Sequence, residues 1–109
     1  MLLLLSCAEP QNIPPELQTS TYADGATIEI PTVGLDVEVT ADDPDGDPLL
    51  FSWTIDGVGL DSEEQPGASS TTSICTLYGA YLDGSTLALL ISDRVDAIGL
   101  SWPLVYVGD

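Results

Sequence analysis

The chain has 109 residues, which is enough for one domain. It carries 18 acidic residues, a single Lys or Arg and no His, so its formal net charge is −17. This balance excludes nucleic-acid binding, which depends on cationic side chains against phosphates, and it excludes histidine-based catalysis and metal ligation. Because 44% of the residues are hydrophobic, the chain differs from a disordered acidic tail and we expect a folded core.

The N-terminus resembles the end of a bacterial lipoprotein signal. A short leucine run leads into Leu4-Leu5-Ser6-Cys7, which resembles the lipobox of that family. The resemblance implies a residual signal peptide at 1–6, cleavage before Cys7, and a lipid on the Cys7 thiol that anchors the protein to a membrane. Ala8 fits the family's sorting rule for the outer membrane. The alternative is an ordinary apolar N-terminus with an incidental cysteine.

Proline is concentrated in the segment that follows. Three prolines, Pro10, Pro14 and Pro15, lie within six positions and predict an extended, polyproline-like arm. Together with Cys7 this arm forms a predicted tether over 7–17, which would hold a domain over 18–109 away from a membrane.

From this point apolar and polar residues alternate with a period of two, which is typical of strands with one buried face. Turn-forming pairs such as Asp45-Gly46 and Asp56-Gly57 separate the runs. We predict seven strands, over 18–22, 27–30, 35–41, 49–55, 71–77, 85–91 and 97–107. Short strands separated by turns predict an all-β, Ig-like antiparallel β-sandwich.

Three details refine this prediction. Pro103 has no amide hydrogen to donate, so the last strand is expected at a sheet edge or a bulge. Residues 62–70 are predicted to form a polar loop. Cys75 lies in a strand-like stretch and is expected to be a buried small hydrophobe. The alternative is a Cys7–Cys75 disulfide, which would exclude lipidation.

One stretch of the predicted domain resembles a known family. Residues 41–53 read ADDPDGDPLLFSW, which resembles the A-x-D-x-D-G-D-P-L-x-(aromatic)-S-W stretch of polycystic-kidney-disease (PKD) domains and related bacterial Ig-like and cadherin-like modules. Ile91-Ser92-Asp93 and Asn12-Ile13-Pro14-Pro15 resemble further parts of the same pattern. The family's W-D-F-G-D-G becomes Trp53-Thr54-Ile55-Asp56-Gly57, and Arg94 stands where glycine is usual. The resemblance implies an Ig-like fold with extracellular protein or glycan contacts.

Four aspartates fall within six residues in this same stretch. In an Ig-type topology their loop lies at the same end of the sandwich as the loop after Ile91-Ser92. Carboxylates from two adjacent loops would form an oxygen-rich site that suits calcium, which accepts six to eight oxygens in loose geometry. The candidate calcium ligands are therefore Asp42, Asp43, Asp45, Asp47, Asp93 and Asp96.

The alternative is that the aspartates only build a turn. Asp-Pro-Asp-Gly is favourable turn chemistry, because Asp bonds to its own backbone and Gly permits a positive φ. Arg94, the only cation of the chain, would then lie among the aspartates and neutralise part of their charge. The two hypotheses differ in what they place between the loops, a space for an ion or the Arg94 side chain.

The aromatic residues divide into core and surface candidates. Trp53 lies in the middle of an alternating strand and is expected in the core. Trp102, beside Pro103 on the expected edge, and Tyr106 are candidates for an exposed contact with a glycan. The alternative is that they lie at the rim of the core.

No enzyme motif accompanies these features. The sequence lacks the G-x-S-x-G nucleophile elbow and the aspartic-protease motifs. We expect a non-catalytic, lipid-anchored protein of the cell envelope, at the outer membrane or cell surface. It would present an Ig-like module for binding of extracellular protein or glycan, or as a spacer. The alternatives are a calcium-stabilised structural module and a small carboxylate hydrolase, which would need a cleft between two carboxylates.

Overall fold

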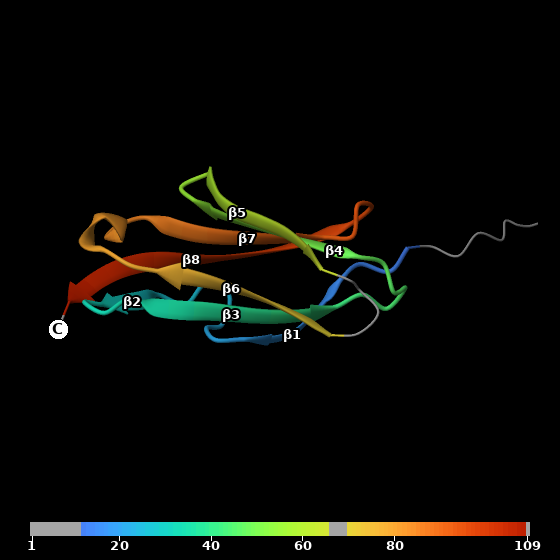
Figure 1. The fold of residues 1–109 in the computed structure, drawn as a ribbon, viewed down its shortest axis with the longest axis horizontal. Helices are drawn as coiled ribbons and strands as arrows, with labels where there is room; N and C mark the ends of the chain where they lie inside the picture. The colour runs from blue at the N-terminus through green and yellow to red at the C-terminus, as the bar shows by residue number, and fades with distance from the viewer. Residues whose placement is uncertain (1–11, 66–69, 109) are drawn as a thin grey trace, which may run out of the picture.

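The computed structural model describes residues 12–65 and 70–108. Two β-sheets pack face to face in these residues (Figure 1), so the predicted all-β, Ig-like sandwich is confirmed. The predictions for residues 1–11, which include the residual signal peptide and Cys7, lie outside the described residues.

The smaller sheet has three antiparallel strands in the order β1-β3-β6. These strands are β1 (Glu16–Ser20), β3 (Leu35–Asp42) and β6 (Thr71–Leu77). The pairing of β3 with β6 is regular over its whole length, whereas the β1–β3 pair contains a register shift between Leu17 and Thr19.

The larger sheet has five strands in the order β2-β8-β7-β4-β5. They are β2 (Ile28–Pro31), β8 (Ala97–Gly108), β7 (Thr86–Ser92), β4 (Leu49–Ile55) and β5 (Val58–Gln65). The β2–β8 pair is parallel, which departs from the purely antiparallel arrangement predicted from the sequence. A short 3₁₀ helix, η1 (Ala80–Leu82), connects β6 to β7.

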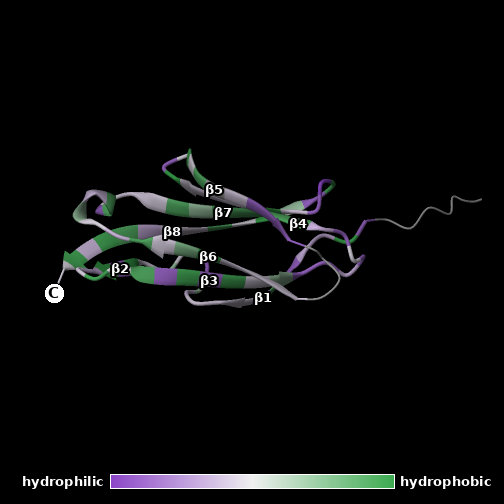
Figure 2. Ribbon diagram, viewed as in Figure 1, coloured by the Kyte–Doolittle hydropathy of each residue, from purple (hydrophilic) through white to green (hydrophobic). Residues whose placement is uncertain are grey.

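The core lies between the two sheets and follows the alternation of the sequence (Figure 2). Along β4 the side chains of Leu49, Phe51 and Trp53 are fully buried, because every second residue of a strand points to the same face. Cys75 on β6 is buried too, as expected for a small hydrophobe. The rings of Trp53 on β4 and Trp102 on β8, both strands of the larger sheet, stack within the core, with centroids 6.2 Å apart and planes 22° apart.

The prediction of an exposed Trp102 is wrong, because this side chain is fully buried. Its indole N–H donates to the carbonyl oxygens of Tyr22 and Ala23, at 3.2 and 2.9 Å. The error came from Pro103, which was expected to mark an edge strand, whereas β8 lies inside the sheet. Tyr106 is half-buried and packs against the core, which agrees with the rim alternative.

The Pro103 nitrogen is tolerated because it faces a local gap in the sheet. The next amide, Leu104 N–H, donates to Ser85 O on the β7 side at 2.8 Å, so the Pro103 nitrogen points to the β2 side. There the pairing with β2 begins only at Leu104, opposite Ile28. An interior strand therefore holds a proline where its neighbour has not yet started.

Strand β5 was missed by the sequence prediction, which placed a loop over 62–70. β5 pairs antiparallel with β4 through a hairpin that turns at Asp56 and Gly57. Both turn residues have positive φ, 51° and 84°, which is the requirement of the type I′ hairpin turn. The prediction of a loop at 62–65 is therefore wrong, and the Asp-Gly pair was the signal for the hairpin.

Candidate metal site

Three segments meet at one end of the sandwich: residues 12–15, the β3–β4 loop at 43–48, and the β7–β8 loop at 93–96 (Figure 1). Hydrogen bonds join residues 12–15 to both loops. Strongly hydrophilic residues gather in these loops (Figure 2). The Ig-type topology thus brings the two acidic loops together, as the sequence predicted.

The β3–β4 loop begins with a tight turn centred on Asp43. The Asp45 amide donates to Asp43 Oδ1 at 2.7 Å, and the Gly46 amide donates to the Asp43 carbonyl oxygen at 2.9 Å. Gly46 has a φ of 78°, a conformation that favours glycine. The turn chemistry proposed as an alternative to a metal site is therefore present, and it also fixes the orientation of the Asp43 carboxylate.

The β7–β8 loop holds Asp93 in a similar way. The amides of Val95 and Asp96 donate to Asp93 Oδ1 at 2.9 and 2.7 Å. The Asp93 amide donates to Asp96 O at 3.0 Å and closes the loop. In each loop, therefore, one aspartate accepts hydrogen bonds at Oδ1 from backbone amides of the same loop.

Asp43, Asp47 and Asp93 form a cluster with one carboxylate oxygen from each residue, all within 4.8 Å of one another. The side chains of Asp43 and Asp93 are each only 3% exposed, and Asp47 is half-buried. Asp43 Oδ2 is buried and has no hydrogen-bond partner within the described part of the chain. The cluster thus concentrates negative charge in a buried place, with one oxygen unsatisfied.

The two buried aspartates differ in their pKa values. Burial raises the pKa of Asp43 above its usual value, and the charges of Asp47 and Asp93 add to this rise against the backbone hydrogen bonds from Asp45 and Asp47. Burial acts in the same direction on Asp93. Hydrogen bonds from the Asp96 amide, the Asn12 side chain and the Val95 amide, together with one from the Asp43 carboxyl group in its protonated form, outweigh it, so the pKa of Asp93 is lowered. Asp93 is therefore held as an anion, whereas the backbone hydrogen bonds to Asp43 only partly offset the cost of burying its ionised form.

The other predicted ligands lie outside this cluster. Asp42 is half-buried at the end of β3. Asp45 Oδ2 accepts from the Ile13 amide, and Asp96 Oδ2 accepts from the Asn12 side chain. Only three of the six candidates are therefore brought together.

Arg94 does not lie among these carboxylates. Its guanidinium forms an ion pair with Glu64 on β5, and its side chain is 68% exposed. The sequence alternative in which Arg94 neutralises the aspartates is therefore wrong.

Asn12 belongs to this site and was missed as a functional residue. Its Nδ2 donates to Asp93 Oδ2 at 2.7 Å and to Asp96 Oδ2 at 3.0 Å. In the sequence it appeared only as part of the lead-in pattern 12–15. Its distance of more than 80 positions from these aspartates left no local signal for the contact.

The donor set fits a hard cation. All of its ligand atoms are oxygens, which suit calcium, magnesium or manganese better than zinc or copper. Two oxygens on one calcium ion lie at most about two bond lengths apart, or about 5 Å, because each Ca–O bond is about 2.4 Å long. The spacing within the cluster satisfies this limit.

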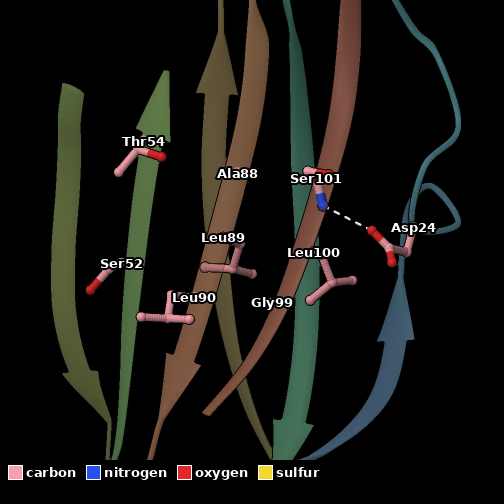
Figure 3. Close-up of a pocket in the computed structure, with 9 residues that line it drawn as sticks. All are labelled: Asp24, Ser52, Thr54, Ala88, Leu89, Leu90, Gly99, Leu100 and Ser101. Atoms are coloured by element: carbon pink, nitrogen blue, oxygen red, sulfur yellow. Dashed lines mark hydrogen bonds between the residues drawn. The ribbon is translucent and has the colours of Figure 1, made fainter. Parts of the chain in front are cut away.

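A second feature is a cavity of about 400 Å³ on the larger sheet (Figure 3). It extends across β4, β7 and β8, and Asp24 lies at its rim, where one carboxylate oxygen accepts from the Ser101 amide at 2.8 Å. The remaining lining is apolar or hydroxylic, so the cavity has no second carboxylate to pair with Asp24.

Comparisons of the sequence with the models of known protein families and with curated proteins gave no match. Fold and site therefore define the class of this protein as an Ig-like β-sandwich with an acidic cluster at one end. Within residues 12–65 and 70–108, no helix is long and apolar enough to cross a membrane.

Proposed function

We propose that this protein is a non-catalytic Ig-like module whose folded state is completed by a calcium ion at Asp43, Asp47 and Asp93. The observation that carries the proposal is the buried, unpartnered Oδ2 of Asp43 beside two further carboxylates. An ionised carboxylate that is buried without a partner destabilises the folded state. A cation held between the three residues removes this cost.

Calcium is favoured over magnesium by the construction of the site. The carboxylates come from two loops and differ in burial, and Asp47 leaves one side open to solvent. Calcium accepts such irregular oxygen sets and completes its shell with water, whereas magnesium demands a near-ideal octahedron with shorter bonds. Asp43, Asp47 and Asp93 would bind the ion, and Asn12 and the loop amides would orient the carboxylates.

The envelope location is part of the same proposal. Calcium sites of extracellular modules bind with dissociation constants of about 0.1–1 mM, so they fill only where calcium is abundant. The lipobox-like Leu4-Leu5-Ser6-Cys7 supports a lipid anchor on Cys7 and a place at the outer membrane or cell surface. The chain enters the domain at the end that carries the cluster (Figure 1), so the anchor would make this the membrane-proximal end. The partner class is an extracellular protein or glycan.

The carboxylate hydrolase is a weaker candidate. Glycosidases separate their two carboxyl groups by at least about 5 Å so that a sugar lies between them. Here Asp43 and Asp93 are each 3% exposed and their oxygens lie within 4.8 Å of each other. This geometry leaves room for an ion and not for a sugar ring.

The direct test is thermal unfolding of the full chain with calcium titrated at constant ionic strength. At about 5 mM calcium, roughly ten times the expected dissociation constant, binding to the folded state adds about 1.4 kcal/mol. For a domain of this size we expect a rise of about 7 °C in Tm. Magnesium at the same ionic strength should give a much smaller rise.

The matched variants are Asp43→Asn and Asp42→Asn. Both remove one charge from neighbouring positions, but only Asp43 belongs to the cluster. The calcium-specific rise should disappear in Asp43→Asn and persist in Asp42→Asn. Equal rises with calcium and magnesium in the unmodified chain would mean simple screening and would overturn the proposal.

The lipid anchor is tested separately by metabolic labelling with a clickable fatty acid in a bacterial host. We expect label on the unmodified chain and on Cys75→Ala, and none on Cys7→Ser. Label that persists in Cys7→Ser, or is missing from the unmodified chain, would contradict the anchor and leave the calcium proposal unaffected.

A further inference from the structure

Residues 12–15, which we call the N-terminal strap, join both acidic loops before β1 begins. Asn12 Nδ2 donates to Asp93 Oδ2 and Asp96 Oδ2 of the β7–β8 loop. The Ile13 amide donates to Asp45 Oδ2 of the β3–β4 loop at 2.7 Å. The strap ends at Pro15, which is buried. Hydrogen bonds thus fasten the start of the domain to the same two loops that supply the cluster.

The strap contacts and the cluster depend on the same loop arrangement. Asp93 takes part in both, because its Oδ2 accepts from Asn12 while its carboxylate belongs to the cluster. Asp45 and Asp43 are joined by the hydrogen bond that closes the turn, from Asp45 N–H to Asp43 Oδ1. A change in the position of either loop therefore acts on the strap and on the cluster together.

Negative charge opposes the close approach of the two loops when no cation is bound. Asp43 and Asp47 from one loop face Asp93 from the other within 4.8 Å, and like charges at this distance repel strongly in a buried place. The donors of the strap are neutral amides, so they do not cancel this repulsion. A divalent cation reverses it and draws the loops into the arrangement that the strap needs.

Building on the proposed calcium site, we propose that the ion and the N-terminal strap stabilise each other. Calcium at Asp43, Asp47 and Asp93 fixes the acceptors Asp45, Asp93 and Asp96, and the strap closes onto them. The direction in which the chain enters the domain is therefore set by calcium, and Asn12 acts as a positioning residue of the site. Because coupling between two binding events is reciprocal, loosening the strap must weaken calcium binding by the same factor.

The first test is amide hydrogen exchange by NMR on the full chain, with calcium or with magnesium at equal ionic strength. We expect calcium to slow exchange of the Ile13 amide by about tenfold, within the usual range of coupling between sites. The Ser101 amide is the internal control. It also donates to a carboxylate, but its acceptor is Asp24, which belongs to neither acidic loop. Its exchange should not change beyond any global stabilisation.

The second test compares Asn12→Ala with Gln18→Ala, an exposed position on β1. Calorimetric titration with calcium should show an affinity about five- to tenfold lower for Asn12→Ala and unchanged for Gln18→Ala. If calcium raises Tm but leaves Ile13 exchange and the affinity of Asn12→Ala unchanged, the strap proposal is overturned and the calcium site stands. If calcium gives no specific rise in Tm, the calcium site itself fails, and the strap proposal fails with it.

Discussion

At the scale of single residues, the opposite pKa shifts of Asp43 and Asp93 determine how the domain responds to acid. The pKa of Asp43 is raised in the folded state. Without a cation, and at a pH between the unfolded and the folded pKa of Asp43, the folded chain therefore carries a proton there that the unfolded chain does not. The pKa of Asp93 is lowered in the folded state. Its contribution to stability is therefore fully present when the pH is above the ordinary Asp pKa, and it is lost as the pH falls through the pKa of folded Asp93.

These two shifts predict a stability maximum in mild acid. In EDTA, Tm should rise as pH falls from about 7 toward the raised pKa of Asp43, and it should fall below about pH 4, where the unfolded chain binds a proton that folded Asp93 does not yet accept. With saturating calcium this rise should be absent, because the ion keeps Asp43 ionised, and Tm should stay level until the carboxylates of the unfolded chain begin to bind protons near pH 4. Thermal scans across this pH range in both buffers measure the difference.

The control for the pH prediction is Asp43→Asn. General relief of the −17 charge also favours mild acid, and it acts on the variant as well. The part of the rise that belongs to Asp43 must therefore be smaller in Asp43→Asn. Identical pH profiles for the two proteins in EDTA would contradict this assignment.

Arg94 is a second residue whose conformation has a measurable effect. Its φ is 81°, in the left-handed region that costs a non-glycine residue about 1–2 kcal/mol. Its ion pair with Glu64 is exposed and contributes at most about 1 kcal/mol. Glycine adopts a positive φ without this cost, so glycine at position 94 relieves the backbone.

We therefore predict that Arg94→Gly is more stable than Arg94→Ala by about 1 kcal/mol in denaturant unfolding. Both variants lose the ion pair, so their difference isolates the backbone conformation. Equal midpoints for the two variants would show that position 94 carries no strain.

At the scale of elements, the two sheets are joined by a polar contact inside the core. The Trp53 indole N–H on β4 donates to Ser73 Oγ on β6 at 2.8 Å, and the Ser73 hydroxyl donates to Glu63 on β5. Both Trp53 and Ser73 are buried. Three strands of two sheets are thus connected through one hydroxyl group.

Replacing Ser73 with Ala leaves the Trp53 N–H buried without a partner. We expect a loss of about 2 kcal/mol and a fall in Tm of about 10 °C. Thr72→Ala is the matched control, because it removes an exposed hydroxyl that contacts Thr40 on β3 and should cost less than about 0.5 kcal/mol. Similar losses in the two variants would exclude a special role for the buried contact.

The strands show what sequence periodicity can reveal. The alternating runs located β4 and β6 at their observed bounds, because apolar residues on one face mark a strand against a core. The sequence prediction missed β5 because β5 is a polar edge strand. Its Glu63 contacts the buried Ser73 instead of adding an apolar side chain to the core. Its position depends on pairing with β4, which periodicity alone does not report.

The candidate site was predicted in outline and not in detail. The density of aspartates and the Ig topology located the two loops correctly. The selection of Asp43, Asp47 and Asp93 depends on loop conformation, which turns Asp45 toward Ile13 and Asp96 toward Asn12. Which aspartates form the cluster therefore depends on tertiary contacts between distant segments, and a local sequence pattern does not predict it.

At the scale of the whole molecule, the core and the charge lie in different places. The buried apolar residues pack together between the sheets, and the acidic cluster lies in the hydrophilic loops at one end (Figure 2). The proposed cation would therefore act at one end of the domain and not within its core. This arrangement suits a module whose attachment to the preceding chain is adjusted while its body stays fixed.

The stacked pair of Trp53 and Trp102 provides an intrinsic fluorescence probe of the core. These are both tryptophans of the chain, and they lie on β4 and β8 of the larger sheet, where both side chains are fully buried. The Trp53 N–H donates to Ser73 on β6 of the smaller sheet, so this bond must break when the two sheets separate. Opening of the sandwich therefore brings water to both rings, and the resulting change in their fluorescence measures it directly.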